Sequence, residues 1–209
     1  MLSLNNSLKG YIVKNEPMER IGGIFAKGRL NLLHGIQGSG KSYGAIKALN
    51  SDGIEPVHVN LDESTGFEEL KVTNVGEDFM IDLFLENFEK DFFDGHVVMI
   101  DTYTRLEQWA FSRGIIVTKE ALFNAIEAID KYYSGLTLII VGHTQPFVGR
   151  DGIFNDNLPL VRGCAEELYL EKQFIKASKT MEAHTKYTMH VCKGRGYDGK
   201  RDIAGWMRD

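Results

Sequence analysis

The sequence has few cysteines and no long apolar run, and each scarcity excludes a class of protein. Its 209 residues include two cysteines, Cys164 and Cys192, with no CxxC pair and no metal-ligand spacing. A disulfide-stapled secreted domain is therefore excluded, and we expect both thiols to be reduced and packed as small apolar groups. No apolar run reaches the roughly 18 residues of a membrane helix, and no signal-peptide pattern opens the chain.

A surplus of positive charge is also missing, because the 29 acidic residues outnumber the 24 lysines and arginines and give a net charge of −5. This balance argues against a broadly basic nucleic-acid binder. It leaves room for a narrow basic groove, since the local field rather than the total charge steers a polyanion. The length and the hydrophobic share of 43% suit one globular core. We expect a single domain over residues 1–209, with residues 1–27 as a short lead-in.

Apolar runs alternate with helical patterns along most of the chain. Continuous apolar runs predict strands over residues 29–34, 56–61, 97–100 and 136–141. Helices are expected over residues 18–24, 42–49, 79–92 and 119–133. Later runs predict strands over residues 167–175 and 187–192, followed by a hairpin turn at Asp198-Gly199. The order predicts an α/β fold, with a mainly parallel twisted sheet flanked by helices and antiparallel strands at its C-terminal end.

The segment after the first predicted strand carries the clearest chemical signal. It fits the pattern GxxxxGK[ST] at every fixed position, between a strand and a helix. Its residues are Gly35, Ile36, Gln37, Gly38, Ser39, Gly40, Lys41 and Ser42, followed by Tyr43. The glycines let successive backbone N–H groups form an anion nest at the helix N-terminus. The segment therefore predicts a P-loop for ATP, with Lys41 on the β- and γ-phosphates and the Ser42 hydroxyl on Mg²⁺.

Acidic residues follow two other predicted strands. Asp101 closes the strand over residues 97–100, where a P-loop protein places its second magnesium-organising carboxylate. A helix-capping aspartate is the alternative. Glu63, or Asp62 in its place, follows the strand over residues 56–61 at the same sheet edge. A carboxylate there could activate the water that attacks the γ-phosphate, although a solvated acidic turn would look the same.

Two further positions suggest control of the nucleotide site. His143 follows the strand over residues 136–141, where it could sense the γ-phosphate, with Gln145 as the alternative sensor. A histidine with a structural role is the competing interpretation. Lys193 and Arg195 end a later strand, and two cations so spaced could reach a phosphate site on a neighbouring subunit. An ordinary basic turn is the alternative.

Residues 145–162 combine aromatic, basic and acidic side chains. The members of interest are Gln145, Phe147, Arg150, Phe154 and Arg162, with Asp151 and Asp156 among them. Aromatic and arginine side chains on a loop suit stacking against single-stranded bases. The acidic pair leaves an ordinary surface loop as an equal alternative.

Together these segments resemble the RecA/DnaB-type P-loop ATPase superfamily over residues 28–199. The resemblance is carried by GRLNLLHGIQGSGKS, VHVNLDES, VVMIDT, LIIVGHTQP and MHVCKGRG. It implies a RecA-like core and assigns roles by position. These are the P-loop Lys41 and Ser42, the catalytic Glu63, the metal-binding Asp101, the switch His143, and the basic finger Lys193 with Arg195. The segment GHT at 142–144 is similar to plasmid-type hexameric replicative helicases, and the short length to RecA-core recombination proteins of bacteriophages.

The resemblance implies a Mg²⁺-dependent ATPase that acts on single-stranded DNA in recombination or replication. It also implies a homo-oligomer with a head-to-tail interface, a ring or a filament, in the cytoplasm of a bacterial or phage-infected cell. Two alternatives stay open. One is a slow ATP-dependent switch or assembly factor without translocation on DNA. The other is a small-molecule kinase, for which the sequence offers no convincing arginine-rich lid or acceptor pocket.

Overall fold

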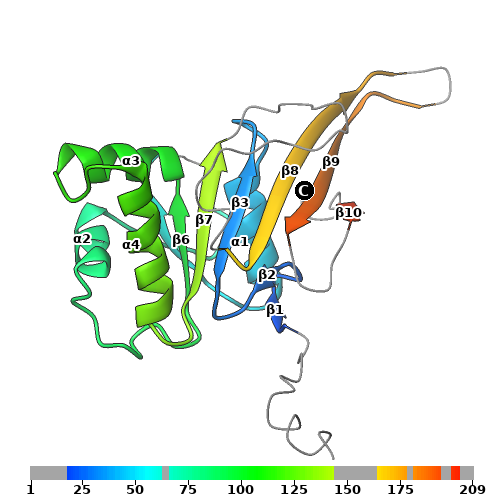
Figure 1. Ribbon diagram of the computed structural model, residues 1–209. Helices are drawn as coiled ribbons and strands as arrows, with labels where there is room; N and C mark the ends of the chain where they lie inside the picture. The colour runs from blue at the N-terminus through cyan, green and yellow to red at the C-terminus, as the bar shows by residue number, and fades with distance from the viewer. Residues whose placement is uncertain (1–17, 63–65, 144–163, 178–180, 194–198, 203–209) are drawn as a thin grey trace, which may run out of the picture.

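A computed structural model describes residues 18–62, 66–143, 164–177, 181–193 and 199–202, and only the backbone from Val191 onward. These residues form an eight-stranded sheet of order β10-β9-β8-β3-β7-β6-β4-β5 (Figure 1). Its strands are β3 (Leu30–Gly35), β4 (Val57–Asn60), β5 (Thr73–Val75), β6 (Val97–Asp101), β7 (Thr137–His143), β8 (Glu166–Ile175), β9 (His184–Lys193) and β10 (Gly199–Asp202). Neighbours from β8 to β5 pair in parallel, whereas β9 pairs antiparallel with β8 and with β10. The prediction of a mainly parallel sheet with C-terminal antiparallel strands is confirmed.

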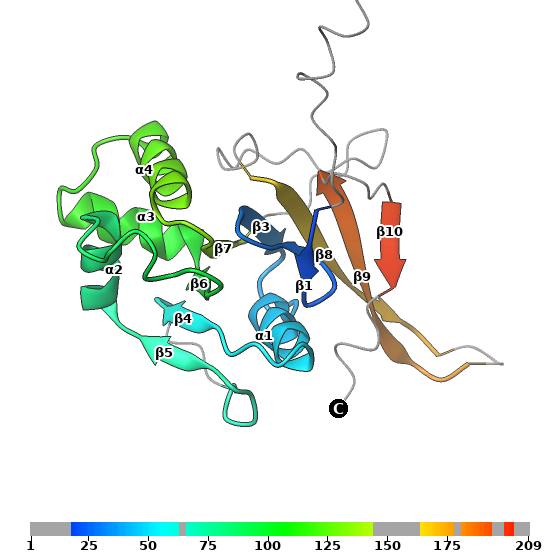
Figure 2. The same cartoon turned by 90° about the horizontal axis from the view of Figure 1, so that it is seen from below.

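Helices cover both faces of the parallel part of the sheet. The four are α1 (Lys41–Ser51), α2 (Glu77–Phe84), α3 (Tyr103–Ser112) and α4 (Lys119–Tyr132). Figures 1 and 2 show α2, α3 and α4 together on one face and α1 on the other. Strand alternation divides the core accordingly. In β6, Val98 and Ile100 pack with α2, α3 and α4, while Val97 and Met99 pack on the α1 side.

Threonine caps begin two helices on the first of these faces. The Thr118 side chain accepts a hydrogen bond from the backbone N–H of Ala121 (3.0 Å), and the next residue starts α4. The buried stripe of α4 is Leu122, Ile126 and Ile129, three of the residues that the periodicity places on its apolar face. Thr102 caps α3 in the same way, a helix that the sequence patterns did not resolve.

The expected helix over residues 18–24 is wrong. The chain there forms a small hairpin of β1 (Arg20–Ile21) and β2 (Phe25–Ala26). Its turn holds Gly22 and Gly23 at φ of 56° and 70°, a left-handed backbone that glycine adopts freely and a helix does not contain. The hairpin then buries Phe25 against the α1 side of the sheet.

The helix expected over residues 79–92 is also shorter in the structure. It spans Glu77–Phe84, and Glu86 then takes a φ of 54°, which turns the chain away from the helix axis. The aromatic residues that suggested a longer helix pack on one another instead. Phe88 lies 5.1 Å from Phe93, ring centre to ring centre, and Phe93 lies 5.0 Å from Tyr133. An aromatic cluster therefore produced the apolar pattern.

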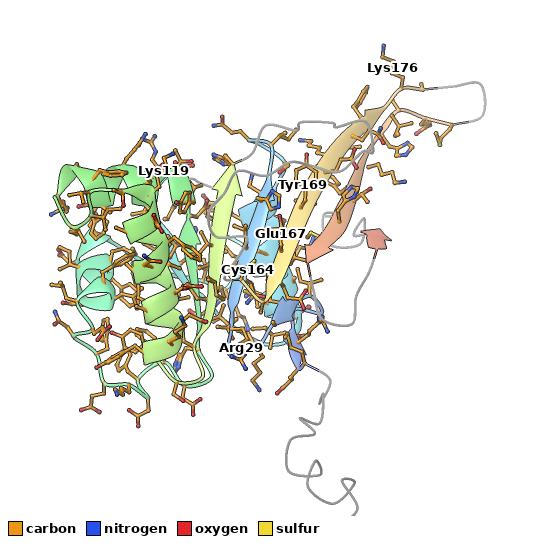
Figure 3. The ribbon with its side chains drawn as sticks, viewed as in Figure 1. Arg29, Lys119, Cys164, Glu167, Tyr169 and Lys176 are labelled. Carbon is orange, nitrogen blue, oxygen red and sulfur yellow. The ribbon has the colours of Figure 1, made fainter. Side chains whose placement is uncertain are left out.

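The C-terminal strands extend the sheet beyond its helices. β8 and β9 form a long two-stranded arm that rises past the ends of β3 and β7 (Figure 1). Figure 3 places Glu167 and Tyr169 of β8 on the sheet face that carries α4, and both are buried there next to His34 of β3. Cys164, just before β8, is buried in the apolar core, as expected, whereas the Cys192 side chain lies outside the described part. Within the described residues, no helix has the length and apolar character to span a membrane.

Candidate nucleotide-binding site

The P-loop follows β3 and leads directly into α1. Gly40 stands at the N-cap of α1 with a φ of 82°, and it has no side chain to accept the N–H groups of the first turn. Those donors therefore remain available to an anion, which the helix dipole also favours. Gly35 is required for a different reason. A Cβ atom at that position would lie 2.4 Å from the carbonyl oxygen of Leu170 in β8.

Lys41 is buried at the first position of α1, with 4% of its surface exposed. Its Nζ donates hydrogen bonds to the carbonyl oxygens of Ile36 (2.9 Å) and Gly35 (3.2 Å). Burial lowers the pKa of Lys41 from 10.5 to about 8, although Asp101 and Asp62 oppose this by their charge. The P-loop thus holds a desolvated cation against neutral acceptors, which phosphate oxygens could replace.

Asp101 ends β6 on the α1 side of the sheet, in step with Val97 and Met99. The hydroxyl of Ser42 donates a hydrogen bond to Asp101 Oδ2, which joins the P-loop helix to β6. Thr102, and not Asp101, is the N-cap residue of the following helix α3. A serine hydroxyl and a carboxylate in contact are oxygen ligands of the kind that Mg²⁺ prefers, and the cation usually keeps waters and phosphate oxygens besides.

The two ligand candidates open into one cavity of about 390 Å³. It is lined by Gln37, Gly38, Gly40, Lys41, Ser42, Tyr43, Asp62, Gly66, Phe67, Asp101 and His143. Most of the predicted site residues in the described ranges are therefore brought together from four separate segments. Gly35, Ile36 and Ser39 are not in its lining. Ser39 is fully buried, and its Oγ has no hydrogen-bond partner among the residues described.

His143 reaches the cavity from the end of β7 and is half-buried. Burial lowers its pKa, and the charge of Lys41 lowers it further, while Asp62 and Asp101 act in the opposite direction. A neutral imidazole beside the P-loop lysine can donate or accept a hydrogen bond. The position that the resemblance assigns to a switch thus lies on the cavity wall.

Asp62 lines the same cavity, and Arg105 of α3 binds it. Arg105 Nε donates to Asp62 Oδ1 at 2.9 Å, a contact that sequence patterns did not indicate. The pairing favours a structural or electrostatic role for Asp62 and leaves the neighbouring Glu63 as the proposed base. Glu63 itself lies outside the described residues.

Three further contacts at the site were missed by the sequence patterns. Lys172 of β8 donates from Nζ to the carbonyl oxygen of Gly38 (3.2 Å) and so connects the arm to the P-loop. The hydroxyl of Tyr43, which lines the cavity, donates a hydrogen bond to Glu69 Oε1 (2.6 Å). His58 of β4 is fully buried, with Nε2 3.5 Å from Asp101 Oδ2. An isolated polar residue in an apolar strand, as in PVHVN, was the available signal for His58.

The described part of the structure does not include the side chains of the remaining predicted residues. Lys193 is the last residue of β9 and its backbone pairs with Glu167, but its side chain lies outside the described part, as does all of Arg195. The proposed DNA-contacting segment, residues 145–162 with the alternative sensor Gln145, also falls outside it. Within the described ranges, no three His, Cys, Asp or Glu residues cluster as metal ligands. A Mg²⁺ site built from one carboxylate, one hydroxyl and nucleotide phosphates does not need such a cluster.

The sequence matches no model of a known protein family and no curated protein.

Proposed function

We propose that this chain is a Mg²⁺-dependent ATPase with a RecA-like core. It acts on DNA in recombination or replication as a head-to-tail homo-oligomer, in the cytoplasm of a bacterial or phage-infected cell. The observation that carries the nucleotide part is the contact between Ser42 and Asp101. These residues lie 59 positions apart, yet they meet at the cavity that also receives Lys41. A P-loop and a strand-end carboxylate in contact suit phosphoryl transfer.

Each residue has a defined task in this proposal. The first-turn N–H groups of α1 and the Lys41 ammonium bind and orient the phosphates. Ser42 and Asp101 would hold Mg²⁺, which when bound neutralises charge on the β- and γ-phosphates. Glu63 takes a proton from the attacking water. His143, on the cavity wall, is the candidate that responds to the state of the γ-phosphate.

ATP turnover with and without single-stranded DNA tests the proposal as a whole. We expect Mg²⁺-dependent hydrolysis that DNA stimulates. Slow turnover that DNA does not change would favour the switch, and phosphate transfer to a nucleoside or its phosphate would favour the kinase. No Mg²⁺-dependent binding of ATP would contradict the proposal entirely.

The DNA part rests on the resemblance and on the residue types in 145–162. Phe147→Ala and Arg150→Ala should each weaken single-strand affinity while basal ATP turnover stays close to that of the wild type. A stacked base contributes about 1–3 kcal/mol, so the loss is measurable by fluorescence anisotropy. Higher salt should weaken binding as counterions are released. No binding at low salt with nucleotide present would remove DNA from the proposal.

Head-to-tail assembly can be tested by mixing two variants. Arg195→Ala and Glu63→Gln damage opposite sides of one composite site, so each should be inactive alone. Mixed assemblies should recover activity wherever an intact Glu63 faces an intact Arg195, because an arginine in trans contributes about 10³–10⁵ in rate. If co-assembled mixtures stay as inactive as their parents, Arg195 belongs to a basic turn of its own subunit.

A further inference from the structure

His58 connects two strands to the carboxylate of the proposed magnesium site. It lies in the middle of β4 with no exposed surface, on the side of the sheet that faces α1. Its Nε2 is 3.5 Å from Asp101 Oδ2, and its Nδ1 is 3.1 Å from the amide oxygen Oδ1 of Asn74 in β5. The Phe67 ring stands edge-on to the imidazole at 5.1 Å. Asn74, His58, Asp101 and Ser42 thus form a chain of polar contacts that runs inward from the edge strand.

The chemistry of Asp101 decides which ring nitrogen must carry a proton. A carboxylate without a proton only accepts hydrogen bonds, so the ring nitrogen facing Asp101 must carry the proton if the contact is to be attractive. Asn74 can serve Nδ1 with either end of its amide, since the two ends have the same shape and exchange by a half turn of the side chain. The contact with Asn74 is therefore compatible with a proton on Nε2.

Packing alone gives a poorer account of this residue. Val59, the next residue of β4, fills the opposite face of the strand as an ordinary apolar core residue. A leucine at position 58 would fill space without placing a polar ring in the interior, where a polar atom without a partner is costly. Nε2 faces Asp101 Oδ2 at 3.5 Å, slightly longer than an ordinary hydrogen bond, and this charged acceptor accounts for a polar ring at this position better than packing does.

We propose that His58 is a positioning residue that orients Asp101 toward Ser42 and so raises the affinity of the site for Mg²⁺. The inference rests on the proposed function, because Asp101 matters in this way only if the site binds Mg²⁺ with nucleotide. Ser42 and His58 approach the same oxygen, Oδ2, from α1 and β4. A carboxylate held on two sides loses less freedom when it takes up a cation.

Two substitutions of His58 separate this role from packing. Gln places its amide nitrogen close to where Nε2 stands, whereas Asn reaches only the place of Nδ1. We expect His58→Asn to raise the Mg²⁺ concentration that half-saturates binding of a fluorescent ATP analogue by about 10–100-fold. His58→Gln should stay close to the wild type. Nucleotide binding measured in EDTA should be the same for all three proteins.

Two further variants keep the test decisive if either His58 protein folds poorly. Asn74→Ala removes an exposed side chain and should raise the Mg²⁺ requirement in the same direction by a smaller factor. Val59→Ala is the matched control. It lies on the same strand and is equally buried, so it should lower stability and leave the Mg²⁺ requirement unchanged.

The outcomes distinguish the inference from the function on which it rests. If the wild type binds the analogue with Mg²⁺ but the Asn and Gln variants at position 58 have equal Mg²⁺ requirements, His58 is a packing residue. An unchanged requirement in Asn74→Ala would also count against the proposed chain of contacts. If the wild type shows no Mg²⁺-dependent binding, the proposed function itself fails.

Discussion

The two faces of the sheet differ most where β6 ends. Under α2, α3 and α4 the strand contributes Val98 and Ile100 to a continuous apolar core. On the α1 side it contributes Met99 to a second apolar cluster and then the buried carboxylate of Asp101. Because side chains alternate along a strand, one five-residue segment supports the fold on one face and the candidate chemistry on the other. The comparison predicts that substitutions on the two faces affect different measurements.

On the α1 face, Lys41 should be the most sensitive position. Lys41→Ala removes the cation that follows charge onto the transferred phosphate, so ATP turnover should fall by about 10²–10³ or more. Stability to urea should be unchanged or higher, because a buried charge is removed. Lys131→Ala on α4 is the control, since its side chain is 74% exposed and should affect neither measurement. Near-normal turnover in Lys41→Ala would contradict the proposed function.

The pH dependence of nucleotide affinity is a second property that should depend on the α1 face alone. Burial lowers the pKa of Lys41 to about 8, so the ammonium form that phosphates attract predominates below that pH and is lost above it. If bound nucleotide keeps Lys41 charged, its Kd should rise about tenfold per pH unit above 8. Titrating a fluorescent ATP analogue across this range measures the slope. Lys41→Arg should bind more weakly but without the slope, because a guanidinium stays protonated.

On the opposite face, the effect should be on stability alone. Ile100 precedes Asp101 in β6, but its side chain packs on the opposite face, against α2, α3 and α4. Ile100→Val removes one methylene there and should lower the free energy of unfolding by about 0.5–1.5 kcal/mol. Urea denaturation measures the loss, and turnover per folded molecule should match the wild type. A large change in turnover would mean that the two faces are coupled at the end of β6.

The smallest expected effect concerns an acidic residue on the helix-covered face. Burial raises the pKa of Asp130 in α4 from 3.8 to about 6, against the opposing charge of Arg29 and a hydrogen bond from the backbone of Leu30. The folded state then binds more protons than the unfolded state between these values, so stability should fall as pH rises from about 4 to 6. Asp130→Asn should flatten that slope and stabilise the protein near neutral pH by an amount on the order of 0.5 kcal/mol.

Thermal unfolding at several pH values tests this expectation. Glu120→Gln on the same helix is the control. Glu120 is exposed in the first turn of α4, at the other end of the helix from Asp130, and its replacement should leave the slope unchanged. A wild-type profile that rises between pH 4 and 6 with the slope unaltered in Asp130→Asn would show that Asp130 stays charged in the folded protein.

Features that depend on short-range patterns could be predicted from the sequence. The P-loop pattern lies within eight residues, and the apolar runs at 97–100 and 136–141 became β6 and β7 because parallel strands buried on both faces are continuously apolar. The helical spacing at 119–133 located α4 for the same local reason. Local patterns failed where turn geometry overrode them, at Gly22-Gly23 and at Glu86.

Contacts between residues far apart in the sequence could not be predicted, because they depend on how the whole sheet is assembled. Nothing near Asp62 in the sequence indicates Arg105, and nothing near Gly35 indicates that Leu170 of β8 lies against it. Likewise, the contact of His58 with Asp101 exists because β4 and β6 are paired neighbours with aligned register. Such contacts depend on strand order and register across the whole sheet. These arise from the packing of all its segments together, and no single segment encodes them.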